Sequence, residues 1–70
     1  MEDWRSIVGK NVRHWRTVAK LTQEQLAFAA EIDLTYVGGI ERGKRNPSVV
    51  VLARIANALE IEPAELLKKS

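Results

Sequence analysis

Apolar residues recur every three or four positions along most of this 70-residue chain, and this spacing predicts an all-α fold. The first stripe spans residues 3–19 and consists of Trp4, Ile7, Val8, Val12, Trp15 and Val18. The apolar run at residues 49–52, which contains three β-branched valines, would also suit a buried strand. Because Ile55, Ala56 and Leu59 continue that apolar set at helical spacing, we expect a helix there. Residues 1–70 are therefore predicted to form one compact five-helix domain.

Capping residues divide the pattern into these helices. Thr22 and Gln25 have the spacing of a capping box, which predicts that a second helix begins at Thr22. Its inward positions are Leu26, Ala27 and Ala30. Asp33 is a suitable N-cap for a third helix over residues 33–42.

The third helix has apolar residues on one face and a glycine after its end. Val37 and Ile40 should face inward, and Gly43 should take the left-handed conformation after Arg42. Ser48 caps the fourth helix, which is expected to end near Leu59. Pro63 opens a short fifth helix in which Leu66 and Leu67 are expected to face inward, one of them in the core and the other in a subunit contact.

Basic residues are concentrated in two segments, although the formal net charge is only +2. Residues 4–20 contain five basic residues and no acid, and residues 42–45 read Arg-Gly-Lys-Arg. Most of the acids lie at segment starts or toward the C-terminus. A basic face of this kind indicates a polyanionic partner better than a membrane surface.

Several other classes of function lack the residues they need. The chain has no cysteine and one histidine, His14, so we predict no metal site and no cofactor. No apolar run approaches the roughly 18 residues that span a bilayer, and the N-terminus does not resemble a signal peptide. No catalytic triad, paired carboxylates or phosphate-binding glycine loop is evident, so we expect neither an enzyme nor a small-molecule ligand. We expect a cytoplasmic protein.

The second and third helices have the organisation of a helix-turn-helix unit: two short helices, a tight turn at Glu31 and Ile32, a glycine stop and a basic loop. In such a unit the third helix, residues 33–42, enters the major groove of DNA. Its rear would be Val37 and Ile40. Its front would carry Asp33, Leu34, Thr35, Tyr36, Gly38 and Gly39, with Arg42 at the C-terminal end.

The residues of this unit resemble the Cro/CI, or XRE, family of helix-turn-helix transcriptional regulators. The resemblance is carried by residues 21–27 (LTQEQLA), by Tyr36-Val37 and by residues 40–48 (IERGKRNPS), and it extends over about residues 7–67. Residues 35–43 most resemble the small restriction–modification controller proteins, which act as dimers. Bacterial or phage regulators of this kind bind double-stranded DNA.

The resemblance implies roles for matching positions. Asp33, Leu34, Thr35, Tyr36 and Gly39 would face the bases, and the phosphates would be contacted by Gln23, Arg42, Lys44, Arg45 and Asn46. Arg16 and Glu41 match a pair that ties the first helix to the end of the third. The family usually has glycine where this chain has Lys20 and Glu31, so we expect left-handed dihedrals there, each costing about 1 kcal/mol.

The front of the third helix has few hydrogen-bonding side chains. Leu34 cannot hydrogen-bond a base and Gly38 has no side chain, so we expect a thymine-methyl contact at Leu34, a hydroxyl contact at Thr35 and close backbone approach at Gly38 and Gly39. The two glycines could instead mark a close-packing site against another helix.

Two functional hypotheses follow. In the first, a homodimer binds a palindromic operator and regulates transcription. In the second, the chain is a protein-interaction module, an antitoxin or adaptor, which uses Leu34, Gly38 and Gly39 as an apolar contact. Trp4 and Trp15 are expected to be core or subunit-contact residues in either case.

Overall fold

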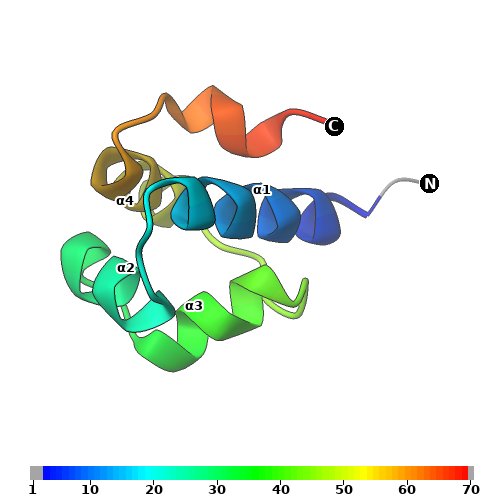
Figure 1. Cartoon of the computed structure of the whole chain (residues 1–70). Coiled ribbons are helices and arrows are strands. Elements are labelled where there is room, and N and C mark those ends of the chain that lie inside the picture. The colour runs from blue at the N-terminus through cyan, green and yellow to red at the C-terminus, as the bar shows by residue number, and fades with distance from the viewer. Residues whose placement is uncertain (1–2, 70) are drawn as a thin grey trace.

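Four α-helices and one short 3-10 helix follow one another along residues 3–69, the part of the chain that the computed structural model describes (Figure 1). The helices are α1 (Trp4–Val18), α2 (Gln23–Ala30), α3 (Leu34–Glu41), α4 (Val49–Leu59) and η1 (Pro63–Leu67). No strand occurs between residues 3 and 69, which confirms the all-α prediction. Figure 1 shows α3 and η1 on opposite sides of α1, so the outer face of α3 points away from the C-terminal segment.

The predicted caps form, and they set the helix starts. Thr22 and Gln25 make both hydrogen bonds of a capping box. Asp33 Oδ1 accepts from the N–H of Thr35 at 2.8 Å, and Ser48 Oγ accepts from the N–H of Val51 at 3.1 Å. Each cap satisfies a backbone donor that has no partner within its own helix.

Left-handed residues follow the helices, as expected at Lys20 and Glu31. Their φ angles are 62° and 58°, and Gly43 has a φ of 72°. Glu60, which the sequence did not single out, is also left-handed, with a φ of 59°. Since residues with a Cβ are disfavoured in this conformation, Lys20, Glu31 and Glu60 carry backbone strain that glycine would relieve.

The prediction of five α-helices is wrong in its last member. Residues 63–67 form a 3-10 helix and not an α-helix. Asn11 on α1 explains how this short segment ends, because its Nδ2 donates to the carbonyl oxygens of Leu66 and Lys68, at 2.9 and 2.7 Å. This side chain satisfies terminal carbonyls that a five-residue helix leaves open.

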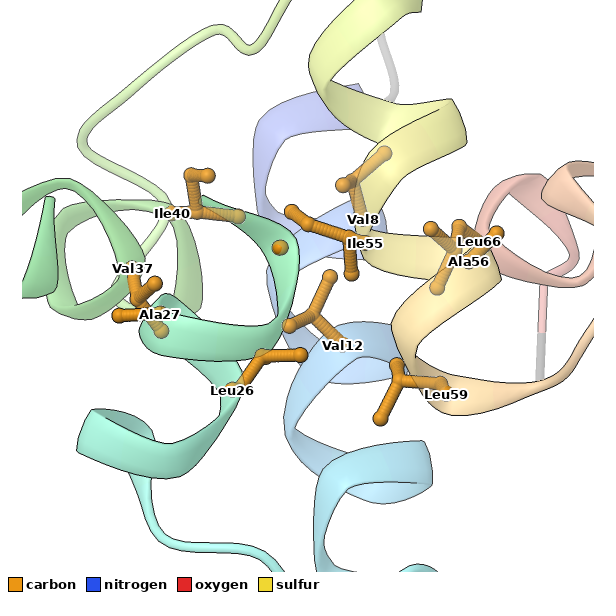
Figure 2. Close-up of a cluster of buried hydrophobic side chains, with 11 residues drawn as sticks. Val8, Val12, Leu26, Ala27, Val37, Ile40, Ile55, Ala56, Leu59 and Leu66 are labelled. Carbon is orange, nitrogen blue, oxygen red and sulfur yellow. The ribbon is translucent and has the colours of Figure 1, made fainter. Parts of the chain in front are cut away.

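One apolar core receives residues from all five helices (Figure 2). Its largest fully buried side chains are Leu26, Ile40, Ile55, Leu66, Val12 and Val37. Val18, which the apolar stripe of α1 included, is exposed. Of the two leucines near the C-terminus, Leu66 is buried and Leu67 is exposed, as expected if only one of them lies in the core.

Gly9 allows α1 to approach α3 closely. A Cβ on Gly9 would collide with the carbonyl oxygen of Ile40 and would lie 2.9 Å from that of Glu41. Because both obstacles are backbone atoms, the helices would have to separate to admit any side chain. The crossing of α1 over the C-terminal half of α3 therefore depends on this glycine, and it sets the position of α3.

Candidate nucleic-acid interface

The rear of α3 is buried as the sequence predicts, and of its predicted front the N-terminal part is exposed whereas Gly38 and Gly39 are buried. Val37 and Ile40 are fully buried in the core. On the opposite side, Asp33, Leu34 and Thr35 are exposed at the start of the helix. The packed rear face thus holds α3 against the protein and leaves its N-terminal half open to a partner.

Arg16 and Glu41 fix the C-terminal end of α3, which confirms the predicted pair. Arg16 Nε donates to Glu41 Oε2 at 2.7 Å, and Nη2 donates to Oε1 at 3.1 Å. Arg16 Nη1 also donates to the carbonyl oxygen of Leu21 at 2.8 Å. The Glu41 side chain is only 3% exposed, and its hydrogen bonds to Arg16 raise the pKa of that guanidinium further above its ordinary value. The pair joins α1 to the end of α3.

Gln23, at the first position of α2, joins the same cluster. Its Nε2 donates to Glu41 Oε1 at 3.0 Å, which orients the side chain toward α3. An amide nitrogen has two hydrogens, so the second can still bond a phosphate. The predicted phosphate contact of Gln23 stays a prediction.

Gly38 and Gly39 are both buried, and arginine side chains lie over them. An ideal Cβ at Gly38 would lie 3.1 Å from Arg42 Nη1, and one at Gly39 would lie 2.6 Å from Arg45 Cγ. Arg45 also places its guanidinium carbon 5.7 Å from the centre of the Tyr36 ring. Close approach of DNA to these glycines would require the arginines to move, so that expectation stays a prediction.

The basic loop begins directly at the end of α3. The N–H of Gly43 donates to the carbonyl of Ile40 at 3.0 Å, and that of Lys44 donates to the carbonyl of Gly39 at 2.8 Å. These bonds close the helix end and hold the loop against it. Arg42, Lys44, Arg45 and Asn46 are all exposed, so the structure brings the predicted phosphate contacts of this loop to the C-terminal end of α3.

Comparison with known proteins identifies this arrangement. The sequence profile of the helix-turn-helix family matches residues 12–66. The chain belongs to the helix-turn-helix (XRE) family. This is a family of DNA-binding transcriptional regulators and not of enzymes.

Three helix-turn-helix proteins illustrate the similarity. Control protein C.SmaI of Serratia marcescens is 37% identical over 67 residues, which are 96% of this chain and 80% of that protein. Control protein C.BamHI of Bacillus amyloliquefaciens is 39% identical over 64 residues, 90% of this chain and 79% of that protein. The restriction–modification controller protein C.AhdI of Aeromonas hydrophila is 48% identical in sequence to this chain. Its crystal structure matches the fold with a TM-score of 0.86, over 89% of this chain and 94% of that one.

Metal sites and membrane-spanning helices are two other possibilities for residues 3–69. No group of three or more His, Cys, Asp or Glu side chains in residues 3–69 could hold a metal ion. None of the described helices is long and apolar enough to cross a membrane.

Sequence analysis missed the contact of Arg45 with Gly39 and Tyr36, because nothing local predicts that a loop side chain folds back over the preceding helix.

Proposed function

We propose that this helix-turn-helix regulator binds a palindromic operator as a homodimer, with α3 in the major groove of each half-site. The observation that carries the proposal is the position of α3. Its rear is buried, Glu41 is tied to Arg16, and a basic loop follows its exposed face. A helix held in this way can enter a groove without losing its own order.

The contacts divide between bases and phosphates. Asp33, Leu34 and Thr35 at the N-terminal half of α3 face the bases, with Leu34 against a thymine methyl and Thr35 as a hydroxyl partner. The phosphates on either side are contacted by Gln23, Arg42, Lys44, Arg45 and Asn46, which fixes the register of α3 and supplies most of the affinity.

A homodimer is required because a single short helix contacts few base pairs. Two copies of α3 would occupy half-sites about 34 Å apart on one side of the duplex. Trp4 and Leu67 supply the contact between copies. Both residues are 47% exposed, and both line a depression of about 380 Å³ beside Pro47 and Leu52. This assigns Leu67, and not the buried Leu66, to the subunit contact.

The rival hypothesis is a protein-interaction module that uses an apolar α3 surface. Its main support is the poor hydrogen-bonding capacity of Leu34, Gly38 and Gly39. The side chains of Arg42 and Arg45 lie over the two glycines, so the surface is cationic where an apolar contact was expected. A cationic surface favours a polyanion as the partner.

Salt-dependent binding tests the proposal against its rival. Fluorescence anisotropy would measure the affinity of the protein for a labelled duplex at increasing salt concentration, with sedimentation to give the stoichiometry. We expect two protein chains on each specific duplex and an affinity that falls steeply with salt. Negligible affinity for any duplex, together with a stoichiometric protein partner, would instead support the interaction module.

A further inference from the structure

Asn11 on α1 makes two hydrogen bonds to the C-terminal segment. Its Nδ2 donates to the carbonyl oxygen of Leu66 at 2.9 Å and to that of Lys68 at 2.7 Å. These two carbonyl groups stand on either side of Leu67 in the chain. Because an amide nitrogen carries two hydrogens, this one side chain uses both of them to hold the backbone around Leu67.

Leu67 is also fixed by its two neighbouring segments. Leu66, directly before it, is fully buried in the core, whereas Leu67 is exposed. Two residues after it, the Lys69 ammonium lies 5.8 Å from the centre of the Trp4 ring, within the roughly 6 Å over which a cation and an aromatic ring attract each other. The core contact, the bonds of Asn11 and the Lys69 contact together place Leu67 near the start of α1.

The depression at this end of the molecule combines residues of α1 and η1. Figure 1 shows η1 running beside α1, with its end toward the start of that helix. Trp4, Val8 and Asn11 share one side of α1, because residues three and four positions apart lie on the same helix face. Trp4, Val8 and Leu67 line the depression, and Asn11 does not. Asn11 therefore acts on the shape of this surface from outside it.

The charges at the edge of the depression favour a second copy of this chain as its partner. Asp3 and Arg5 flank Trp4 in sequence, are exposed, and both line the depression. Arg5 Nε lies 3.8 Å from Asp3 Oδ1, and such a loose, exposed pair contributes little within one copy. In a two-fold contact the same patch meets itself, so the acid of one copy faces the base of the other. A patch with both signs beside apolar residues is complementary to itself.

We infer that Asn11 positions Leu67 for the contact between subunits and thereby sets the strength of the dimer. This inference rests on the proposed function, in which Trp4 and Leu67 of two copies meet. Without the amide, the carbonyl groups on either side of Leu67 bind water, and the side chain must be ordered again when the copies associate. That ordering costs free energy, and the cost counts twice because each copy contributes the same patch.

Asn57 on α4 provides a matched control for Asn11. It is an exposed asparagine in a helix, and its side chain makes no hydrogen bond to another residue among residues 3–69. It does not line the depression. Replacement of either asparagine by alanine removes the same amide and changes no charge, so a difference between the two variants reports the bonds that Asn11 makes.

The test measures the dissociation constant of the dimer by sedimentation equilibrium. The proteins are the wild type, Asn11→Ala, Asn57→Ala, Leu67→Ala and the double variant Asn11→Ala with Leu67→Ala. We expect Asn11→Ala to weaken the dimer by about tenfold or more, and Asn57→Ala to leave it unchanged. The double variant should be no weaker than Leu67→Ala alone, because Asn11 acts through that side chain.

Two further measurements separate this role from general stability. Circular dichroism and thermal melting show whether each variant folds. Asn11→Ser, whose hydroxyl can donate one hydrogen bond, should weaken the dimer less than Asn11→Ala, and it carries the test if the alanine variant does not fold. On a duplex with a single half-site, which one chain occupies, Asn11→Ala should bind as tightly as the wild type, because α3 is unchanged.

The outcomes separate this inference from the proposed function. If Asn11→Ala dimerises as tightly as Asn57→Ala, the inference fails while the proposed function stands. A double variant in which the losses simply add would show that Asn11 acts through the fold and not through Leu67, which also overturns the positioning role. A wild-type protein that stays monomeric both in solution and on its operator would overturn the proposed homodimer as well.

Discussion

Arg16 on α1 and Glu41 at the end of α3 form a two-point ion pair, with Nε 2.7 Å from Oε2 and Nη2 3.1 Å from Oε1. Gln23 adds a third donor to the same carboxylate, at 3.0 Å. The Arg16 and Glu41 side chains are 15% and 3% exposed, so water replaces little of this network if one partner is removed. The pair fixes the helix that is proposed to enter the groove.

Glu41→Ala should therefore lower the free energy of unfolding by about 3 kcal/mol, because it leaves the Arg16 guanidinium largely buried without its counter-charge. Urea denaturation measures the effect. Glu65→Ala is the control, since Glu65 pairs with Lys68 at a much more exposed site, and it should cost less than about 1 kcal/mol. Equal losses in the two variants would show that the Arg16–Glu41 pair is not a structural tie.

Gly9→Ala should destabilise the protein although alanine favours helices. The added methyl group meets the backbone carbonyl oxygens of Ile40 and Glu41, so α1 and α3 must move apart. We expect a net loss of about 2 kcal/mol in denaturant unfolding, after a gain of about 1 kcal/mol from helix propensity. An unchanged or raised stability would mean that the crossing of α1 and α3 does not depend on Gly9.

Asp3 should contribute pH-dependent stability. Its carboxylate accepts hydrogen bonds from the Ser6 hydroxyl and from the N–H of Arg5, which hold the pKa of Asp3 below its ordinary value. A lowered folded pKa means that the contribution is present at neutral pH and is lost as the pH falls through that pKa. Thermal melts from about pH 6 to about pH 2 should show the wild type losing stability relative to Asp3→Asn, whose amide does not titrate. Parallel curves would contradict this role.

Thr35→Ala should change the base preference of the protein at a single position of each half-site. The hydroxyl of Thr35 is exposed on the front of α3, where it can bond one base edge. Affinities for duplexes that differ at one base pair measure the effect. A loss of the same size for every duplex would count against direct readout by Thr35.

The sequence predicted those features that depend on a few adjacent residues. Thr22, Asp33 and Ser48 cap helices because each bonds a backbone N–H two or three residues ahead. Gly43 ends α3 for an equally local reason. The pair of Arg16 and Glu41 was predicted from the family resemblance and not from spacing.

The features that the sequence did not predict depend on contacts between distant segments. Residues 63–67 form a 3-10 helix whose end is bonded by Asn11, which is 55 residues from Leu66 in the chain. Gly9 matters only because α1 crosses the backbone of α3 at that point. Arg45 was assigned to the phosphates with the rest of its loop, and its contact with Gly39 emerges only when the loop folds back on α3.

The central claim is that a homodimer places two copies of α3 in the major groove of a two-fold-related operator. Selection of duplexes from a random pool by the purified protein, followed by sequencing, tests this claim most directly. We predict enrichment of an inverted repeat whose half-sites are centred about 10 base pairs apart. Recovery of no enriched sequence, or of a single site without two-fold symmetry, would contradict the account.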